Sequence, residues 1–146
     1  MEQEGIRAIV KYPDQKPVEK TLKGGYKEIS DICQGLIDIT TLPDDPSVTL
    51  IVNDVSLVNG MRPNIVMPEY RTVLCGPIVV CGADLETGES VSLSKEQLEK
   101  AESYLRENEV HHMSLEGAYR YCQAIAPLRE AEKQLREEQK QEEMQA

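Results

Sequence analysis

Short stretches in which apolar and polar residues alternate predict a β-sheet in the first half of the chain. In the first stretch, Ile6, Ala8 and Val10 are two residues apart, which is the side-chain period of a half-buried strand. Turn sequences rich in proline join the stretches in pairs, as in antiparallel hairpins. The predicted strands cover residues 5–12, 18–22, 36–42 and 48–53.

Other segments show the spacing of helices. After the second predicted strand, apolar residues recur three or four positions apart and end at Gly35, a residue type that commonly follows the last turn of a helix. Ser94 and Gln97 form the sequence of a capping box, which opens a helix. Pro127 fits the first turn of the last helix. The predicted helices are residues 26–34, 95–107, 113–125 and 127–143.

The segment 71–82 is mostly apolar and predicts a central strand. Gly76 and Pro77 interrupt it, and because proline cannot donate a hydrogen bond to a neighbouring strand, we expect a bulge or bend there. Residues 90–93 are expected to return briefly after a turn at Thr87-Gly88. The predicted fold is α+β, with a mixed or antiparallel sheet of five to six strands, one early helix and helices at the C-terminal end. The predicted core includes Ile9, Ile32, Ile37, Ile39, Leu50, Val52, Ile78 and Val80.

The pattern divides the chain into two parts. We expect residues 1–108 to form one α+β domain and residues 109–146 to form a helical C-terminal extension with a charged tail. The tail carries a sparse apolar stripe of Leu128, Ala131 and Leu135. Because isolated helices are marginal in water, this tail is either a frayed solubilising segment or a helix that binds a partner.

Composition excludes several classes of function. The chain has 26 acidic and 16 basic residues, a net charge of −10, which repels phosphate and argues against direct nucleic-acid binding. No apolar run reaches the roughly 20 residues of a membrane span, so we expect a cytoplasmic protein without a membrane role. The four cysteines lack the C-x-x-C spacing of metal or redox motifs, and we expect free, buried thiols.

The connection after residue 53 is the strongest candidate for a binding site. It concentrates amide side chains, which offer donors and acceptors without charge. The two arginines that flank it are the only basic residues between Glu28 and Ser94. The segment is also compatible with an ordinary turn at Asn59-Gly60. In the functional interpretation, the arginines bind phosphate, the asparagines contact polar groups and a tyrosine stacks on a base. The predicted ligand-binding residues are Asn53, Asn59, Arg62, Asn64, Tyr70 and Arg71.

Catalytic signatures are missing from the sequence. A nucleophile needs a nearby base, and the two histidines, His111 and His112, lie next to each other in a connection between helices. Their side chains diverge and do not form a joint metal site. The chain has no H-E-x-x-H, Walker glycine loop or G-x-S-x-G motif. We therefore predict no catalytic residue, no metal ligand and no cofactor.

Residues from about 5 to 104 resemble an uncharacterised small α+β domain family that is common in bacteriophages and mobile elements of bacteria. The resemblance depends on a Gly followed by an Ile-rich strand, a strand that ends in Asn, a Leu–Asn–Gly–x–x–Pro–Asn stretch, a Gly-containing apolar strand and a Ser–Leu–Ser helix start. These segments are residues 35–39 (GLIDI), 50–53 (LIVN), 57–64 (LVNGMRPN), 74–82 (LCGPIVVCG) and 92–97 (SLSKEQ).

The resemblance implies an accessory phage protein that acts in the host cytoplasm. Small phage proteins of this kind often counter host defence by sequestering nucleotide immune signals, such as cyclic ADP-ribose isomers or cyclic oligonucleotides. The leading hypothesis is therefore a non-enzymatic protein that binds a nucleotide-like ligand, with a homo-oligomer as one form in which the binding pocket could be built. The alternatives are an acidic protein that inhibits a host macromolecule by direct binding, and an enzyme that degrades such a nucleotide.

Overall fold

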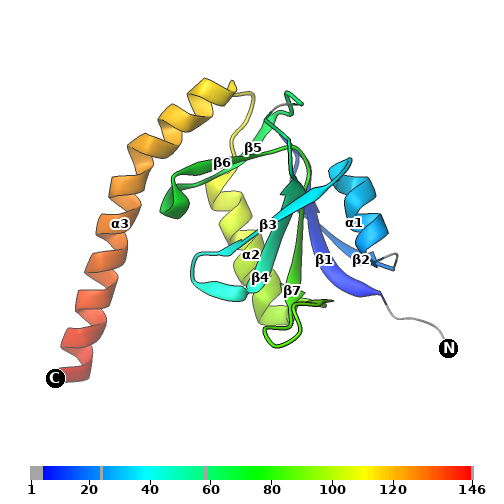
Figure 1. Cartoon of the computed structure of the whole chain (residues 1–146). Helices are drawn as coiled ribbons and strands as arrows, with labels where there is room; N and C mark the ends of the chain where they lie inside the picture. The colour runs from blue at the N-terminus through cyan, green and yellow to red at the C-terminus, as the bar shows by residue number, and fades with distance from the viewer. Residues whose placement is uncertain (1–4, 24, 58, 146) are drawn as a thin grey trace.

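An antiparallel sheet forms the centre of the molecule in the computed structural model, which describes residues 5–23, 25–57 and 59–145 (Figure 1). The strand order is β2-β1-β7-β4-β3, and the short strand β8 pairs with β7. Every strand pair is antiparallel, as expected for a chain built from hairpins. The strands of this sheet are β1 (Ile6–Lys11), β2 (Val18–Leu22), β3 (Ile37–Leu42), β4 (Asp45–Asn53), β7 (Ile78–Ala83) and β8 (Ser90–Val91).

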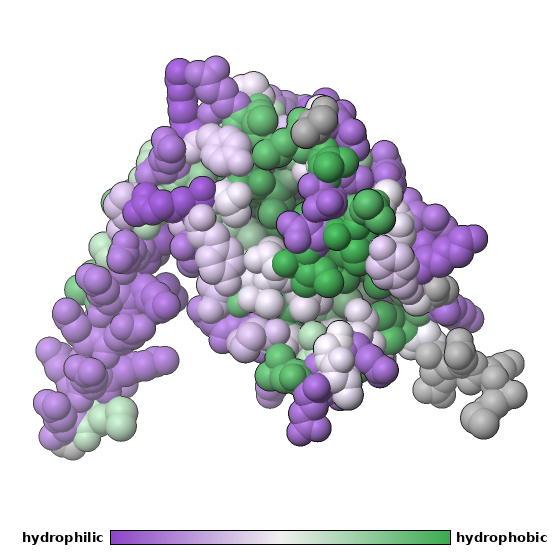
Figure 2. Space-filling model, in the orientation of Figure 1, coloured by the Kyte–Doolittle hydropathy of each residue, from purple (hydrophilic) through white to green (hydrophobic). Residues whose placement is uncertain are grey.

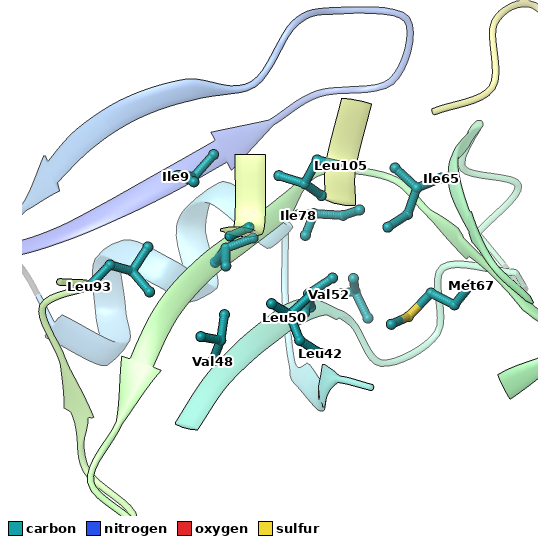
Figure 3. Close-up of a cluster of buried hydrophobic side chains, with 12 residues drawn as sticks. Ile9, Leu42, Val48, Leu50, Val52, Ile65, Met67, Ile78, Leu93 and Leu105 are labelled. Atoms are coloured by element: carbon teal, nitrogen blue, oxygen red, sulfur yellow. The ribbon is translucent and has the colours of Figure 1, made fainter. Parts of the chain in front are cut away.

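Two helices cover the two faces of the sheet. Helix α1 (Gly25–Cys33) packs against one face through Ile29 and Cys33. Helix α2 (Lys95–Asn108) packs against the other through Ala101 and Leu105, beside the larger core cluster drawn in Figure 3. Burying one aliphatic side chain of this kind stabilises the fold by about 1.5–3 kcal/mol. The central strands are thus buried on both faces, which explains why their sequences are almost continuously apolar.

The predicted start of α2 is confirmed. The Ser94 hydroxyl accepts a hydrogen bond from the Gln97 backbone N–H at 3.2 Å, and the Gln97 side chain accepts one from the Ser94 N–H at 2.8 Å. This reciprocal capping box satisfies two backbone donors that the first helical turn leaves without partners. No helix among the described residues is long and apolar enough to cross a membrane.

The predicted strand over residues 71–82 is two strands that belong to different sheets. Strand β6 (Thr72–Cys75) pairs with β5 (Pro63–Met67) in a separate hairpin, and β7 joins the central sheet. A 3₁₀ turn, η1 (Pro68–Tyr70), connects β5 to β6. Gly76 and Pro77 lie between β6 and β7, so the expected bend is in fact the point where the chain changes sheets.

The C-terminal region forms one helix, α3 (Leu115–Gln145), so the prediction of two helices separated at Pro127 was wrong. Proline inside a helix removes one backbone hydrogen bond, but the residues after it are strong helix formers that continue the helix. The first part of α3 packs on β5, β6 and η1 through Ala118, Cys122 and Ala126. The remainder projects away from the body of the molecule (Figure 1).

Most of the predicted core is confirmed, with one error at Ile39. The residues that are buried as predicted are Ile9, Leu50, Val52, Ile78 and Val80, and Ile32 and Ile37 are partly buried. Ile39 is 55% exposed. It lies on β3, the edge strand of the sheet, whereas α1 packs mainly over β2, β4 and β7. The alternation of residues in β3 was predicted correctly. Because β3 is at the edge of the sheet, however, no helix covers the side chain of Ile39.

Candidate functional site

Asn53, predicted to contact a ligand, is a buried structural residue. Its Nδ2 donates to the carbonyl oxygens of Cys33 at 2.9 Å and Gln34 at 3.3 Å, and its Oδ1 accepts from the Val55 N–H at 2.8 Å. These bonds connect the C-terminal end of α1 to the loop after β4. The Asn53 side chain is therefore fully engaged within the protein and is not exposed to a ligand in this structure.

Asn64 is also buried, with no exposed surface. Its Oδ1 accepts a hydrogen bond from the Lys11 Nζ at 2.7 Å. Its Nδ2 donates to the carbonyl oxygens of Lys11 and Gly76, both at 2.8 Å. One amide thus joins β1, β5 and the connection between β6 and β7, which is a structural role rather than the predicted contact with a ligand.

Lys11 was not singled out from the sequence, although it is a fully buried lysine at the end of β1. Its Nζ lies 3.7 Å from the Glu109 carboxylate in addition to its bond with Asn64. Burial lowers the pKa of Lys11, while the charges of Glu109 and Asp14 oppose that shift. Strand alternation could have predicted the burial of Lys11, because this residue lies on the same face of β1 as the core residue Ile9.

Arg62 lies two residues before Asn64, but its side chain is 60% exposed. Its Nη2 is 2.7 Å from the Asp14 carboxylate and 3.3 Å from the Nδ1 of His112. Asp14 also accepts a hydrogen bond from the His112 backbone N–H at 2.8 Å. That backbone bond, aided by the charge of Arg62, holds the pKa of Asp14 below its usual value. Asp14 therefore stays ionised and fixes the direction of the Arg62 guanidinium.

A shallow groove of about 290 Å³ opens beside Arg62. Four connections that are distant in the sequence form its walls: the β1–β2 turn, the end of α1, the segment before β5 and the β6–β7 connection. Gly76 is required there, because its φ of +78° favours glycine and an added Cβ would lie 2.5 Å from the Met61 sulfur. The lining residues are Tyr12, Pro13, Gln15, Gln34, Met61, Arg62, Gly76 and Pro77.

The other predicted ligand-binding residues do not meet at this groove. Arg71 lies at the turn of the β5–β6 hairpin, whereas Arg62 precedes its open end. Four residue steps along β5 separate the two ends, which is about 13 Å at the usual rise of a strand. Tyr70 lies at the same turn as Arg71, with its hydroxyl 3.5 Å from that of Thr41. Asn59 is exposed and outside the residues that line the groove.

The two histidines contact neighbouring side chains, and the four cysteines are buried. The Nε2 of His111 is 3.0 Å from the Glu109 carboxylate, and His112 contacts Asp14 and Arg62. The four cysteines are free and buried, as expected, and burial raises the pKa of Cys33 and of Cys75 to about 11. Among the described residues, no group of three or more His, Cys, Asp or Glu side chains is placed to hold a metal ion.

The family model that matches this chain is described as a domain of unknown function, DUF3846, and it covers residues 6–107. The match spans more than half of the chain, so the protein belongs to this family. The matched region includes both sheets and α1 and α2, while α3 lies beyond it. No curated protein and no solved structure matches the chain.

Proposed function

We propose that this member of the DUF3846 family binds a small anionic ligand with a planar ring, of the phosphorylated nucleotide kind, in the groove beside Arg62. The observation that carries the proposal is an exposed guanidinium, oriented by Asp14, at the wall of a groove that also contains an aromatic side chain. Arginine suits this role because its planar fork of donors matches the oxygens of phosphate.

The groove offers a separate contact for each part of such a ligand. Within the part of the chain that the structure describes, the contacts of Arg62 with Asp14 and His112 run through Nη2, so Nε and Nη1 remain available to phosphate oxygens. Tyr12, which is 40% exposed, supplies a ring for stacking. The amides of Gln15 and Gln34 can donate to and accept from the polar edge of a base.

The size and charge of the site limit what it accepts. Small-molecule pockets measure about 300–1,000 Å³, so this groove lies just below that range and has room for one ring with an attached anionic group. The net charge of −10 repels anions at long range, so binding depends on the local contacts of Arg62. Because Asp14 already holds Arg62 in place, less side-chain entropy is lost on binding.

The ligand is retained without cleavage in this proposal. The high thiol pKa of Cys33 and Cys75 makes them poor nucleophiles at neutral pH, and both are buried. The described contacts of His112 are with Asp14 and Arg62, and neither of these side chains is a hydroxyl or thiol nucleophile. The wider role, sequestration of an immune nucleotide on behalf of a phage, is supported by the sequence resemblance alone.

Isothermal titration calorimetry against a panel of linear and cyclic nucleotides tests the proposal. Arg62→Ala should weaken binding about 10- to 100-fold, because a hydrogen bond to a charged group contributes about 1.5–3 kcal/mol. Tyr12→Ala should weaken it as well. Arg71→Ala is the matched control, since it removes an exposed arginine at the far end of the β5–β6 hairpin and should leave affinity unchanged.

Three results would overturn the proposal. The first is the failure of every ligand in the panel to bind. The second is an equal loss of affinity in Arg62→Ala and Arg71→Ala. The third concerns the fate of the ligand: a nucleotide recovered after heating the complex should be chemically intact. If it is recovered cleaved, and His112→Ala abolishes the cleavage, the protein is an enzyme.

A further inference from the structure

The projecting part of α3 carries an apolar stripe that the rest of the molecule does not cover. Leu128 is 64% exposed and Leu135 is 60% exposed, although they lie on a helix whose first part is well packed. Figure 2 shows the rest of this projecting segment as mainly hydrophilic. Ala124 and Ala131 lie on the same side of the helix, three or four residues from the leucines, so the four side chains follow the spacing of a coiled-coil seam.

The stripe is not a continuation of the face that packs on the body. At 100° per residue, the direction of Leu128, Ala131 and Leu135 is rotated by roughly 150° from that of Ala118, Cys122 and Ala126. The body therefore cannot cover the stripe by a small bend of the helix. An isolated helical segment of this length is marginal in water, so a partner that covers the stripe would stabilise it.

We infer that the stripe is an antiparallel dimer interface that binds the same stripe of a second copy of this chain. A two-fold axis near residues 129 and 130 places Leu128 opposite Ala131 of the second copy and Ala124 opposite its Leu135. Each large side chain then meets a small one, which allows close packing of two helices. The stripe is complementary to itself, as the shared surface of a two-fold dimer must be.

The charges along α3 favour the same arrangement. The basic residues of the projecting part lie on the side of the helix away from the stripe. Beyond Leu135 the stripe continues as Glu138. In the antiparallel dimer Glu138 lies opposite Tyr121 of the second copy and one position from its Arg120, on the same side of the seam. The Arg120 side chain is 77% exposed, and its ion pair within the described part of the chain is with Glu116, one turn away on the same helix. The acidic end of one helix thus meets a cation and a hydroxyl group of the other.

Analytical ultracentrifugation of the full chain across a wide range of concentration tests the interface. The wild type should shift from monomer to dimer as concentration rises. Leu128→Glu with Leu135→Glu should be monomeric throughout, because four carboxylates would meet in the seam. Leu85→Glu is the matched control: Leu85 is 69% exposed in the β7–β8 turn, and its replacement should leave dimerisation unchanged.

Disulfide trapping tests the direction of the helices. The pair Ala124→Cys and Leu135→Cys in one chain should give a covalent dimer under mild oxidation, because each new thiol faces the other type across the seam. The two positions are 11 residues apart, about 16 Å within one helix, so they cannot bond to each other in the same chain. Either substitution alone should give no covalent dimer.

Three results would overturn the inference. A wild-type chain that stays monomeric at every concentration excludes the dimer. A dimer that survives Leu128→Glu with Leu135→Glu lies elsewhere on the molecule. Efficient trapping of Leu135→Cys alone shows a parallel pair. Ligand binding in the groove is measured separately with the Arg62 variants, so either proposal can fail without the other.

Discussion

Two polar clusters lie next to each other in this protein, and the same three segments of chain supply both. The first segment is the end of β1 with the turn after it, the second is the start of β5 with the residues before it, and the third is the α2–α3 connection. They provide Lys11, Asn64 and Glu109 to one cluster. They provide Asp14, Arg62 and His112 to the other. The first cluster is centred on a lysine with no exposed surface, and the second on an arginine whose side chain is 60% exposed.

The difference between the clusters shows that burial, rather than residue type, separates structural from available polar groups. In the Lys11 cluster the donors and acceptors of Asn64 are used within the protein, so their loss should affect folding. In the Arg62 cluster part of the guanidinium faces solvent, so its loss should affect binding and little else. The three asparagines of the predicted site range from fully buried to exposed. Replacing each with alanine therefore tests how the effect depends on burial.

The largest effect is expected for Asn64→Ala, which leaves the ammonium group of Lys11 without its closest acceptor in a buried site. Breaking a buried charged interaction from one side costs about 3–5 kcal/mol of unfolding free energy. Urea unfolding at neutral pH measures it. Adding Lys11→Met to Asn64→Ala should recover part of the loss, because the uncompensated charge is gone. If the double variant is no more stable than Asn64→Ala, the charge of Lys11 is not the cause.

A smaller loss is expected for Asn53→Ala. This change removes three hydrogen bonds between the end of α1 and the loop after β4 and leaves buried backbone groups without partners. We expect a cost of about 1–3 kcal/mol in the free energy of unfolding, without a buried charge to increase it. The same urea series gives the value. A cost equal to that of Asn64→Ala would contradict the role assigned to Lys11.

The ionisation of Asp14 in the Arg62 cluster should make the stability of the protein depend on pH. The pKa of Asp14 is lower in the folded protein than its ordinary value of 3.8. Its stabilising effect is therefore complete above that value and is lost as the pH falls through the lower, folded-state pKa. Asp14→Asn should flatten this acid-side loss in thermal unfolding measured from pH 6 down to about pH 2. An unchanged pH profile would show that Asp14 is not held ionised by the fold.

The smallest effect is expected for Asn59→Ala. Asn59 is exposed in a turn, and substitutions at such positions usually change stability by less than about 0.5 kcal/mol. The side chain is also outside the groove lining, so calorimetry should give wild-type ligand affinity. This variant is the internal control for the other two asparagines. A loss of ligand binding in Asn59→Ala would return this residue to the binding site.

Much of the fold could be predicted from local patterns. The two early hairpins, α1 and α2 depend on residues that are close in sequence, such as the reciprocal bonds of Ser94 and Gln97. The interruption at Gly76-Pro77 was also visible, because proline cannot take part in a continuous strand ladder. The separate β5–β6 hairpin was missed although its pairing is local, because all five residues of β5 are buried and the strand therefore shows no alternation of apolar and polar residues.

The candidate site was also predicted only in part. Local patterns in the sequence were visible, but the packing of distant segments against each other was not. The sequence indicated that polar residues gather between residues 53 and 71 and that Arg62 is an isolated cation there. It contained no information about which of these side chains face inward. Asn64 is buried because β5 passes over the end of β1, and Tyr12 joins the groove because the β1–β2 turn lies beside the segment before β5.

The sequence by itself determined the α+β class, the two early hairpins, the capped helix and the free thiols, because hydrophobic period, turn chemistry and cysteine spacing act over short stretches of chain. Only the tertiary structure decided that Ile39 is exposed, that Asn64 is buried against Lys11, and that Arg62 and Arg71 lie at opposite ends of a hairpin. Each of these outcomes depends on which distant segment lies against the residue. Burial and pairing between distant segments are properties of the packed chain, and they decide here whether a polar side chain is structural or free to bind.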